Sequence, residues 1–246
     1  MTITPDGKYL YTADLGSANV SAFAINQTNG GLSSLGTIDT GLSGSEAITA
    51  TNNFVFVNAE DDQIATLKIG SDGKLSCSSS GCITTETGAR FNAMAADRSG
   101  KFLFAASNGD YQLYGYSIGT DGALTPLTSS PGALTNGQWF GQVSFSIDNK
   151  SLYVADESNG VYAFSFNANN GAVAAVSGSP YPNSSSYAMT VAVDPSNGFV
   201  YSDDGETDIF GWKRDKTTGA LTSIDTPDQP LATSAVGSVT AVTVTF

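Results

Sequence analysis

A short β-rich segment recurs five times along the chain at a nearly constant interval. Its copies begin at residues 8, 53, 101, 150 and 198, so successive starts lie 45, 48, 49 and 48 residues apart. Each copy opens on Lys, Asn or Gly and ends on Tyr or Phe, as in Lys8–Tyr11. A period of about 40 to 50 residues with short strands in each unit is typical of propeller blades. The interval therefore predicts a chain built from repeated β-blades.

Every repeat has room for four strands. An apolar run such as residues 143–147 precedes the recurring segment, and a run with period-two alternation such as residues 161–166 follows it. A hairpin containing a pair such as Asn170–Gly171 then leads into the fourth strand, because Asn-Gly and Asp-Gly supply the positive φ that tight hairpins need. No segment has the length or periodicity of a helix. The sequence predicts an all-β protein, a β-propeller with five blades of four antiparallel strands.

The two ends of the chain suggest how the blades close. One more period of 48 after residue 198 reaches 246, so residues 238–246 form a first strand without successors, while residues 1–4 are only the stub of one. We expect the C-terminal strand to complete the first blade, which removes exposed sheet edges; the alternative is a piece of a larger propeller. Met1 runs straight into a turn at residues 5–7, so no leader peptide is expected unless one was removed or never included. The prediction is a single domain, 1–246, with repeats at about 1–44, 45–90, 91–138, 139–186 and 187–235.

The charge balance excludes several classes of partner and enzyme. The chain has 10 Lys and Arg, 23 Asp and Glu and no His, which gives a net charge of −13. Such an acidic chain is repelled by nucleic acid, and no run approaches the ~18 apolar residues of a membrane span. We therefore expect no nucleic-acid partner and no membrane insertion. Without histidine, a Ser-His-Asp hydrolase, an HExxH protease and an imidazole zinc site are impossible in this chain alone.

The repeat pattern resembles that of a known family. Residues 4–25, 97–131 and 193–222 share a strand, an Asp-Pro-x-Gly-Lys-like turn, an Asn-Val-Ser-Ala-Phe-like strand and a Thr-x-Gly-Ala-Leu-Thr-like hairpin. This pattern resembles the lactonase (6-phosphogluconolactonase-like) β-propeller family, and weaker copies extend the resemblance over almost the whole chain. The resemblance implies a propeller that usually has seven blades, and a site of His, Arg and carboxylate residues in the catalytic members. Because this chain has no His, that site does not carry over residue by residue.

Blade topology assigns nearly all of the excess negative charge to one face. We define the top face as the loops between the second and third strands together with the segments that precede each first strand, and the bottom face as the remaining turns and hairpins. The loops between second and third strands hold 11 of the 23 acids, whereas eight of the ten bases fall on the bottom face. No cofactor is required, but a negative face could bind Ca²⁺ or a basic partner, or merely keep the protein soluble. The candidate Ca²⁺ ligands are Glu60, Asp61, Asp62, Asp203, Asp204 and Glu206.

A second group of candidates comes just before the first strands, on the same top face. Its aromatic members could stack on a sugar or could simply pack between blades; they are Phe91, Trp139, Phe140 and Tyr187. Arg90 could polarise a lactone carbonyl while Glu46 acts as the base, which makes these two the candidate catalytic residues.

The two cysteines indicate the cellular compartment in which the protein resides. Cys77 and Cys82 are separated by four Ser or Gly residues, a spacing that allows a small disulfide loop. We expect this bridge rather than two free thiols, and it would indicate an extracellular or periplasmic location.

Three functional hypotheses remain open at this stage. The first is a secreted binding or scaffolding module whose top face takes a carbohydrate, a small molecule or a protein. The sequence favours this hypothesis over an enzyme, because it shows charge asymmetry and no catalytic constellation. The second is a lactone hydrolase like the named members of the family. The third is a subunit that self-assembles by stacking or by strand exchange.

Overall fold

The computed structural model describes most of the chain in atomic detail. The residues it describes are 1–14, 16–42, 45–59, 63–77, 82–85, 89, 91–127, 134, 137–183, 185, 187–206, 208–224 and 232–233. Within these ranges every regular element is a β-strand, and no helix is present that is long and apolar enough to cross a membrane.

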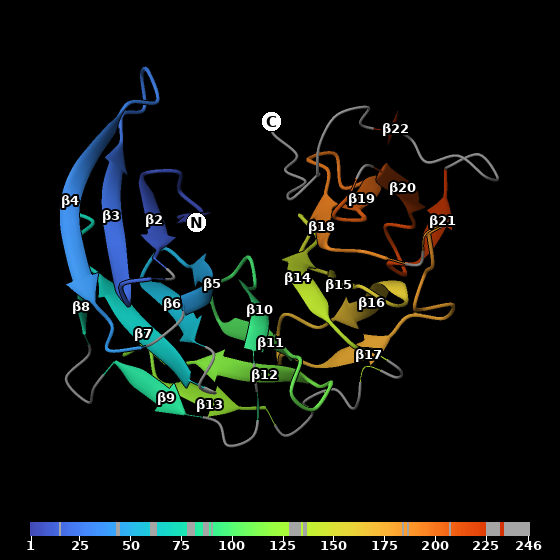
Figure 1. Ribbon diagram of the computed structural model, residues 1–246, viewed down its shortest axis with the longest axis horizontal. Helices are drawn as coiled ribbons and strands as arrows, with labels where there is room; N and C mark the ends of the chain where they lie inside the picture. The colour runs from blue at the N-terminus through green and yellow to red at the C-terminus, as the bar shows by residue number, and fades with distance from the viewer. Residues whose placement is uncertain are drawn as a thin grey trace. The chain divides into compact units, whose positions relative to one another are not determined.

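The described strands form five sheets, each with a path of four consecutive antiparallel strands (Figure 1). Blade 1 contains β1 (Thr2–Ile3), β2 (Tyr9–Ala13), β3 (Asn19–Ile25) and β4 (Leu32–Asp39). Blade 2 contains β5 (Ser45–Ala50), β6 (Phe54–Ala59), β7 (Gln63–Ile69) and β8 (Leu75–Cys77), and β9 (Ile83–Thr85) also pairs with β7. Blade 3 contains β10 (Phe91–Ala96), β11 (Phe102–Ser107), β12 (Leu113–Ile118) and β13 (Leu124–Pro126).

The last two blades follow the same order. Blade 4 contains β14 (Phe140–Phe145), β15 (Ser151–Asp156), β16 (Gly160–Phe166) and β17 (Val173–Ala175). Blade 5 contains β18 (Thr190–Val193), β19 (Phe199–Asp203), β20 (Asp208–Arg214) and β21 (Leu221–Ser223), and β22 (Ala232–Thr233) also pairs with β20. The all-β class and the five four-stranded blades of the sequence prediction are confirmed. The proposed closing strand, residues 238–246, lies outside the described residues.

The turn between the first and second strands explains why the recurring segment is so regular. In blade 5, Asp194 Oδ1 accepts the backbone N–H groups of Gly198 at 2.7 Å and Phe199 at 2.6 Å. Asp97 does the same for Lys101 and Phe102 in blade 3, both at 2.8 Å. An Asp side chain that satisfies the amides of the next strand fixes where that strand begins.

The fourth strand is divided into two pieces in at least two blades. In blade 2, β8 pairs with the end of β7, where Leu67 faces Cys77, and β9 pairs with its beginning, where Ala65 faces Ile83. In blade 5, β21 and β22 share β20 in the same manner. The outer edge of these blades is therefore held by two short ladders on one neighbour.

The chain forms two compact units. Unit 1 contains residues 1–110 and 116–126, and unit 2 contains residues 111–115 and 127–246. In unit 1 a buried cluster links blades 1 and 2; its members include Tyr11, Val20, Leu42, Val55, Val57 and Leu67. In unit 2 a second cluster links blades 4 and 5; its members include Tyr153, Val161, Val191, Val200, Phe210 and Trp212. Each cluster is built from the alternate side chains that the period-two pattern directs inward.

Polar contacts lock neighbouring blades together inside each unit. The hydroxyl of Tyr11 in blade 1 donates to the carbonyl of Gly73 in blade 2 at 3.0 Å, and that of Tyr153 in blade 4 donates to the carbonyl of Gly219 in blade 5 at 2.9 Å. Between blades 4 and 5 the buried guanidinium of Arg214 also donates to the Tyr153 hydroxyl and pairs with Asp148 at 3.1 Å. A fully buried cation with such partners is costly to leave unpaired, so it fixes the geometry at the bottom of this pair of blades.

Candidate functional site

Residues 187–189 join blades 4 and 5 at the top face of unit 2. The backbone N–H of Ala188 donates to the carbonyl of Asp156 in blade 4 at 3.0 Å, and that of Met189 donates to the carbonyl of Asp203 in blade 5 at 2.9 Å. The Tyr187 hydroxyl donates to Glu157 Oε2 at 2.8 Å. This short segment therefore aligns the top-face loops of two blades.

A glycine allows this close approach. Gly141, in β14, has no room for a Cβ because the backbone carbonyl of Met189 lies directly against it. Next to it, Gln142 Oε1 accepts the backbone N–H of Val191 at 3.0 Å, which ties β14 to β18. The first strands of blades 4 and 5 thus lie side by side, and the segment before β18 is held against β14.

The loop after β19 forms the other wall of the site. Asp203 is fully buried, accepts the Thr190 hydroxyl and accepts the N–H of Gly205 at 2.9 Å. Asp204 Oδ1 accepts the N–H groups of Glu206 and Asp208, both at 3.0 Å. Gly205 has a φ of +73° and faces the Met189 side chain, so the loop needs glycine at this position.

These elements enclose a pocket of about 520 Å³, a size typical of small-molecule sites. Its lining combines an aromatic ring and a thioether with two carboxylates; the residues are Ser185, Tyr187, Met189, Asp204, Gly205 and Glu206. All of them belong to unit 2. The described lining contains no Lys or Arg, so the pocket favours uncharged or cationic groups over anions.

The hydrogen bond to Glu157, together with partial burial, raises the pKa of Tyr187 to about 12. Tyr187 therefore keeps its proton at neutral pH and presents a neutral aromatic face to the pocket. In contrast, desolvation raises the pKa of Asp203 above its ordinary value, and the neighbouring charge of Asp204 adds to this effect. The loop that supports the pocket thus contains a carboxyl group whose charged form is disfavoured.

The structure separates the four predicted aromatic residues into two kinds. Trp139 and Tyr187 are 49% and 37% exposed, whereas Phe91 and Phe140 are buried at 0% and 1%. Phe140 packs edge-on against Tyr162, with ring centroids 6.5 Å apart. Phe91 and Phe140 therefore pack within the blades, and only the other two present surface to a ligand.

The other predicted site residues differ in what the structure shows of them. Asp204 and Glu206 line the pocket, and Asp203 lies in its supporting loop. Within the described parts of the chain, no group of three or more Asp, Glu or Cys side chains is arranged to hold a metal ion. Ca²⁺ binding by Asp203, Asp204 and Glu206 stays a prediction. Arg90, Glu60, Asp61, Asp62 and the side chain of Glu46 lie outside the described residues.

Sequence reasoning missed Glu157 as the partner of Tyr187 and missed Ser185 and Met189 as lining residues. Glu157 carries a signal that could have identified it, because it follows the second strand of blade 4 just as Asp204 follows that of blade 5. Ser185 and Met189 have no such signal, since their placement depends on how blade 4 packs against blade 5.

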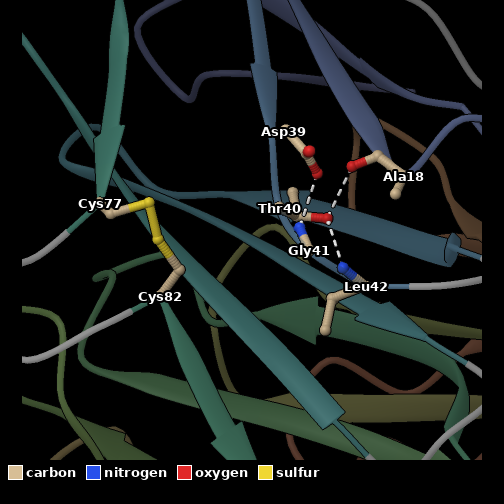
Figure 2. The surroundings of a disulfide bond; sticks show 7 residues. All are labelled: Ala18, Asp39, Thr40, Gly41, Leu42, Cys77 and Cys82. Atoms are coloured by element: carbon tan, nitrogen blue, oxygen red, sulfur yellow. Dashed lines mark hydrogen bonds between the residues drawn. A yellow bond between two sulfur atoms is a disulfide. The ribbon is translucent and has the colours of Figure 1, made fainter.

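The predicted disulfide is present in unit 1. Cys77, at the end of β8, is bonded to Cys82, just before β9, and their Cα atoms are 4.9 Å apart (Figure 2). The bond joins the two pieces of the divided outer strand in blade 2. Nearby, Thr40 donates to the carbonyl of Ala18 at 2.7 Å and accepts the N–H of Leu42, which closes the end of β4 (Figure 2).

The chain resembles known proteins both in sequence and in fold. The sequence pattern of a repeat of unknown function, DUF6923, matches residues 55–243. No curated protein matches the chain.

Several solved structures share the fold. A protein from Lactobacillus plantarum is 21% identical, with 94% of this chain and 70% of that chain covered and a TM-score of 0.71. A protein from Bacteroides uniformis, provisionally named a 6-phosphogluconolactonase, is 17% identical, with coverage of 93% and 83% and a TM-score of 0.56. A periplasmic gluconolactonase from Pseudomonas aeruginosa is 13% identical, with coverage of 98% and 88% and a TM-score of 0.56. At these identities the likeness establishes the lactonase-like propeller fold and nothing finer.

Proposed function

Because the chain belongs to the DUF6923 repeat family and has a lactonase-like propeller fold, we propose that it hydrolyses uncharged sugar lactones in the pocket between blades 4 and 5. The observation that carries this proposal is the pocket itself. It places the face of Tyr187 and the side chain of Met189 beside the carboxylates of Asp204 and Glu206.

This combination of surfaces suits a sugar ring. The C–H faces of a sugar pack on aromatic and apolar side chains, and its hydroxyl groups donate hydrogen bonds to carboxylates. The proposed substrate is a sugar lactone rather than its 6-phosphate. A phosphate needs Lys or Arg to neutralise it, whereas the described lining offers Asp204 and Glu206, with Glu157 nearby.

Glu206 is the proposed general base. Its side chain is exposed at the pocket, whereas Asp204 uses an oxygen to hold the N–H groups of Glu206 and Asp208. Water attacks the lactone carbonyl carbon and gives its proton to the Glu206 carboxylate. The tetrahedral intermediate then collapses, the bond from the carbonyl carbon to the ring oxygen breaks, and that oxygen receives the proton from Glu206. The product is the open hydroxy acid.

The test is the rate of acid release from gluconolactone and from 6-phosphogluconolactone, after subtraction of the buffer rate. We expect catalysed hydrolysis of gluconolactone, little of the phosphorylated compound, and a loss of kcat of about 100-fold in Glu206→Gln, within the range of general-base effects. Asp215→Asn is the matched control, because Asp215 is an exposed acid on the bottom face of the same blade. Hydrolysis of gluconolactone at the buffer rate would contradict the proposal, and a preference for the 6-phosphate would contradict its substrate class.

A second candidate is a binding module that holds a saccharide in this pocket without turning it over. It is favoured by the engagement of Glu157 with Tyr187 and of Asp204 with backbone amides, which leaves fewer carboxylates for chemistry. Saturable saccharide binding by a protein that does not accelerate lactone hydrolysis would decide for this candidate.

We also propose an extracellular or periplasmic location. The Cys77–Cys82 disulfide supports it, because such bonds persist in oxidising compartments. The Pseudomonas aeruginosa protein of the same fold, a periplasmic gluconolactonase, is consistent with this location.

A further inference from the structure

Trp139 lies on the same top face as the pocket, one blade away from its main lining. Its backbone carbonyl accepts the N–H of Glu157 at 2.9 Å, and Glu157 Oε2 in turn accepts the Tyr187 hydroxyl. Trp139 immediately precedes β14, and the segment of Tyr187 precedes β18, which lies beside β14. Glu157 therefore links Trp139 with Tyr187.

The backbone holds the Trp139 ring toward solvent. The next residue, Phe140, points into blade 4 and is buried, so the alternation of the strand directs the two side chains in opposite directions. The residue before Trp139 is also held, because the N–H of Gln138 donates to Asp156 Oδ2 at 2.9 Å. Trp139 thus extends from a backbone that is fixed on both sides.

Packing does not account for this tryptophan. It is 49% exposed, whereas the only other tryptophan in the chain, Trp212, is 1% exposed in the core of blade 5. Trp139 is not among the residues that line the pocket, but it is half exposed on the same face, and a tryptophan ring offers a large apolar surface with a polar N–H for contact with a ligand.

We propose that Trp139 is a second sugar-contacting site, so that the ligand of this face is at least a disaccharide. This inference rests on the proposed function for the pocket. The terminal lactone ring occupies the pocket at Tyr187 and Glu206, and the next sugar ring lies on Trp139 with Glu157 between the two. Trp139 is not among the residues that line the pocket, so the second ring lies on this tryptophan outside the pocket.

The first test compares substrates of one and two rings. The kcat/KM values of the wild type and of Trp139→Ala are measured with gluconolactone, cellobionolactone and maltobionolactone, which differ in the number and linkage of the rings. We expect Trp139→Ala to lower kcat/KM about tenfold for at least one disaccharide lactone, as the loss of one aromatic contact implies. The value for gluconolactone should change less than twofold, and Trp139→Phe should retain most of the activity on the disaccharide.

Phe199→Ala is the matched control, because Phe199 is a 36% exposed aromatic residue at the bottom end of blade 5. Equal thermal melting of Trp139→Ala and the wild type shows that the variant is folded. Equal losses on one-ring and two-ring lactones, or no loss on either, would overturn the second site while leaving the lactonase proposal intact.

The second test does not depend on hydrolysis. Since Trp212 is buried, acrylamide quenching of tryptophan fluorescence reports mainly on Trp139. We expect cellobiose or maltose to protect the fluorescence of the wild type from acrylamide, and glucose to protect it much less. Protection in a protein that hydrolyses no lactone would support the second site and reject the lactonase. No protection by either disaccharide would overturn the second site.

Discussion

Asp203 shows how one residue can shape the pocket without lining it. Its carboxyl group is buried, yet it accepts the Thr190 hydroxyl and the N–H of Gly205, and so holds the loop that carries Asp204 and Glu206. Desolvation is the main cause of its raised pKa. Burial thus disfavours the ionised form of Asp203, although the loop depends on the hydrogen bonds of this side chain.

The raised pKa of Asp203 predicts a pH dependence of stability. Between its ordinary value of 3.8 and the raised value, the folded protein binds more protons at this site than the unfolded chain. The contribution of Asp203 to the free energy of unfolding is therefore greatest below pH 3.8 and falls as the pH rises through that interval. Asp203→Asn removes the titration but keeps an oxygen for Gly205 and an amide for Thr190. We expect the stability of this variant relative to the wild type to increase as the pH rises from 3 to 7 in urea unfolding.

Asp194 provides a control of the opposite sign. Burial pushes its pKa upward, but the hydrogen bonds from Ser196, Phe199 and Gly198 outweigh this effect, and the pKa lies below 3.8. Its stabilising contribution is present above pH 3.8 and is lost as the pH falls through its lowered value. Asp194→Asn should therefore lose stability relative to the wild type as the pH rises. If both variants gave curves parallel to the wild type, the assignment of the two shifts would be wrong.

At the scale of the element, the disulfide lies within the divided outer strand of blade 2. It closes a six-residue loop between two pieces of the outer strand of blade 2, and Cys82 also packs against the buried cluster of unit 1. A loop of this length gives an entropic stabilisation of about 2 kcal/mol. The bond thus acts locally, because it joins the two pieces and keeps both of them paired with β7.

Removal of the disulfide should have a limited effect. Cys77→Ser with Cys82→Ser is expected to lower the free energy of unfolding by about 2 kcal/mol, measured in denaturant. Wild-type protein kept in reductant should lose a similar amount and serves as the control. Without reductant, no thiol should react in the denatured wild type, and titration of two thiols would contradict the bond.

The whole molecule has no histidine, and this limits its pH–rate profile. No side chain with an ordinary pKa near 6.5 is present, and Tyr187 holds its proton up to about pH 12. If Glu206 is the base, Glu206→Gln should lower kcat/KM for gluconolactone at every pH from 6 to 8, because no imidazole is available to replace the carboxylate. A stopped-flow profile corrected for buffer hydrolysis measures this. Wild-type kcat/KM in the Glu206→Gln variant across this range would show that Glu206 is not the base.

The fold was largely predictable because its signals are local and repeated. The period of about 48 residues and the alternation in each third strand located the blades, and the run predicted at 161–166 falls within β16 (Gly160–Phe166). Asp97 and Asp194 mark the start of the second strand in blades 3 and 5. Thr51 and Ser146 do so in blades 2 and 4. The divided outer strands were not predicted, because pieces of two or three residues are too short to show a period.

The site was less predictable because it depends on contacts between blades. The sequence predicted the same ligand-binding role for Trp139 and Phe140. Only the direction of β14 shows that Trp139 is exposed and Phe140 is buried. Likewise, Asp203 and Asp204 are adjacent acids, yet only Asp204 lines the pocket. Met189 can approach β14 because Gly141 has no side chain. No local sequence pattern predicts this contact.

The divided outer strand of blade 2 also makes the protein a scaffold for grafting. Leu67 is paired with Cys77 and Ala65 with Ile83 on two separate ladders, and the Cys77–Cys82 disulfide joins the two pieces. A foreign peptide placed between the two pieces would leave both ladders in register. Such a peptide would be inserted in unit 1, whereas the residues that line the pocket belong to unit 2.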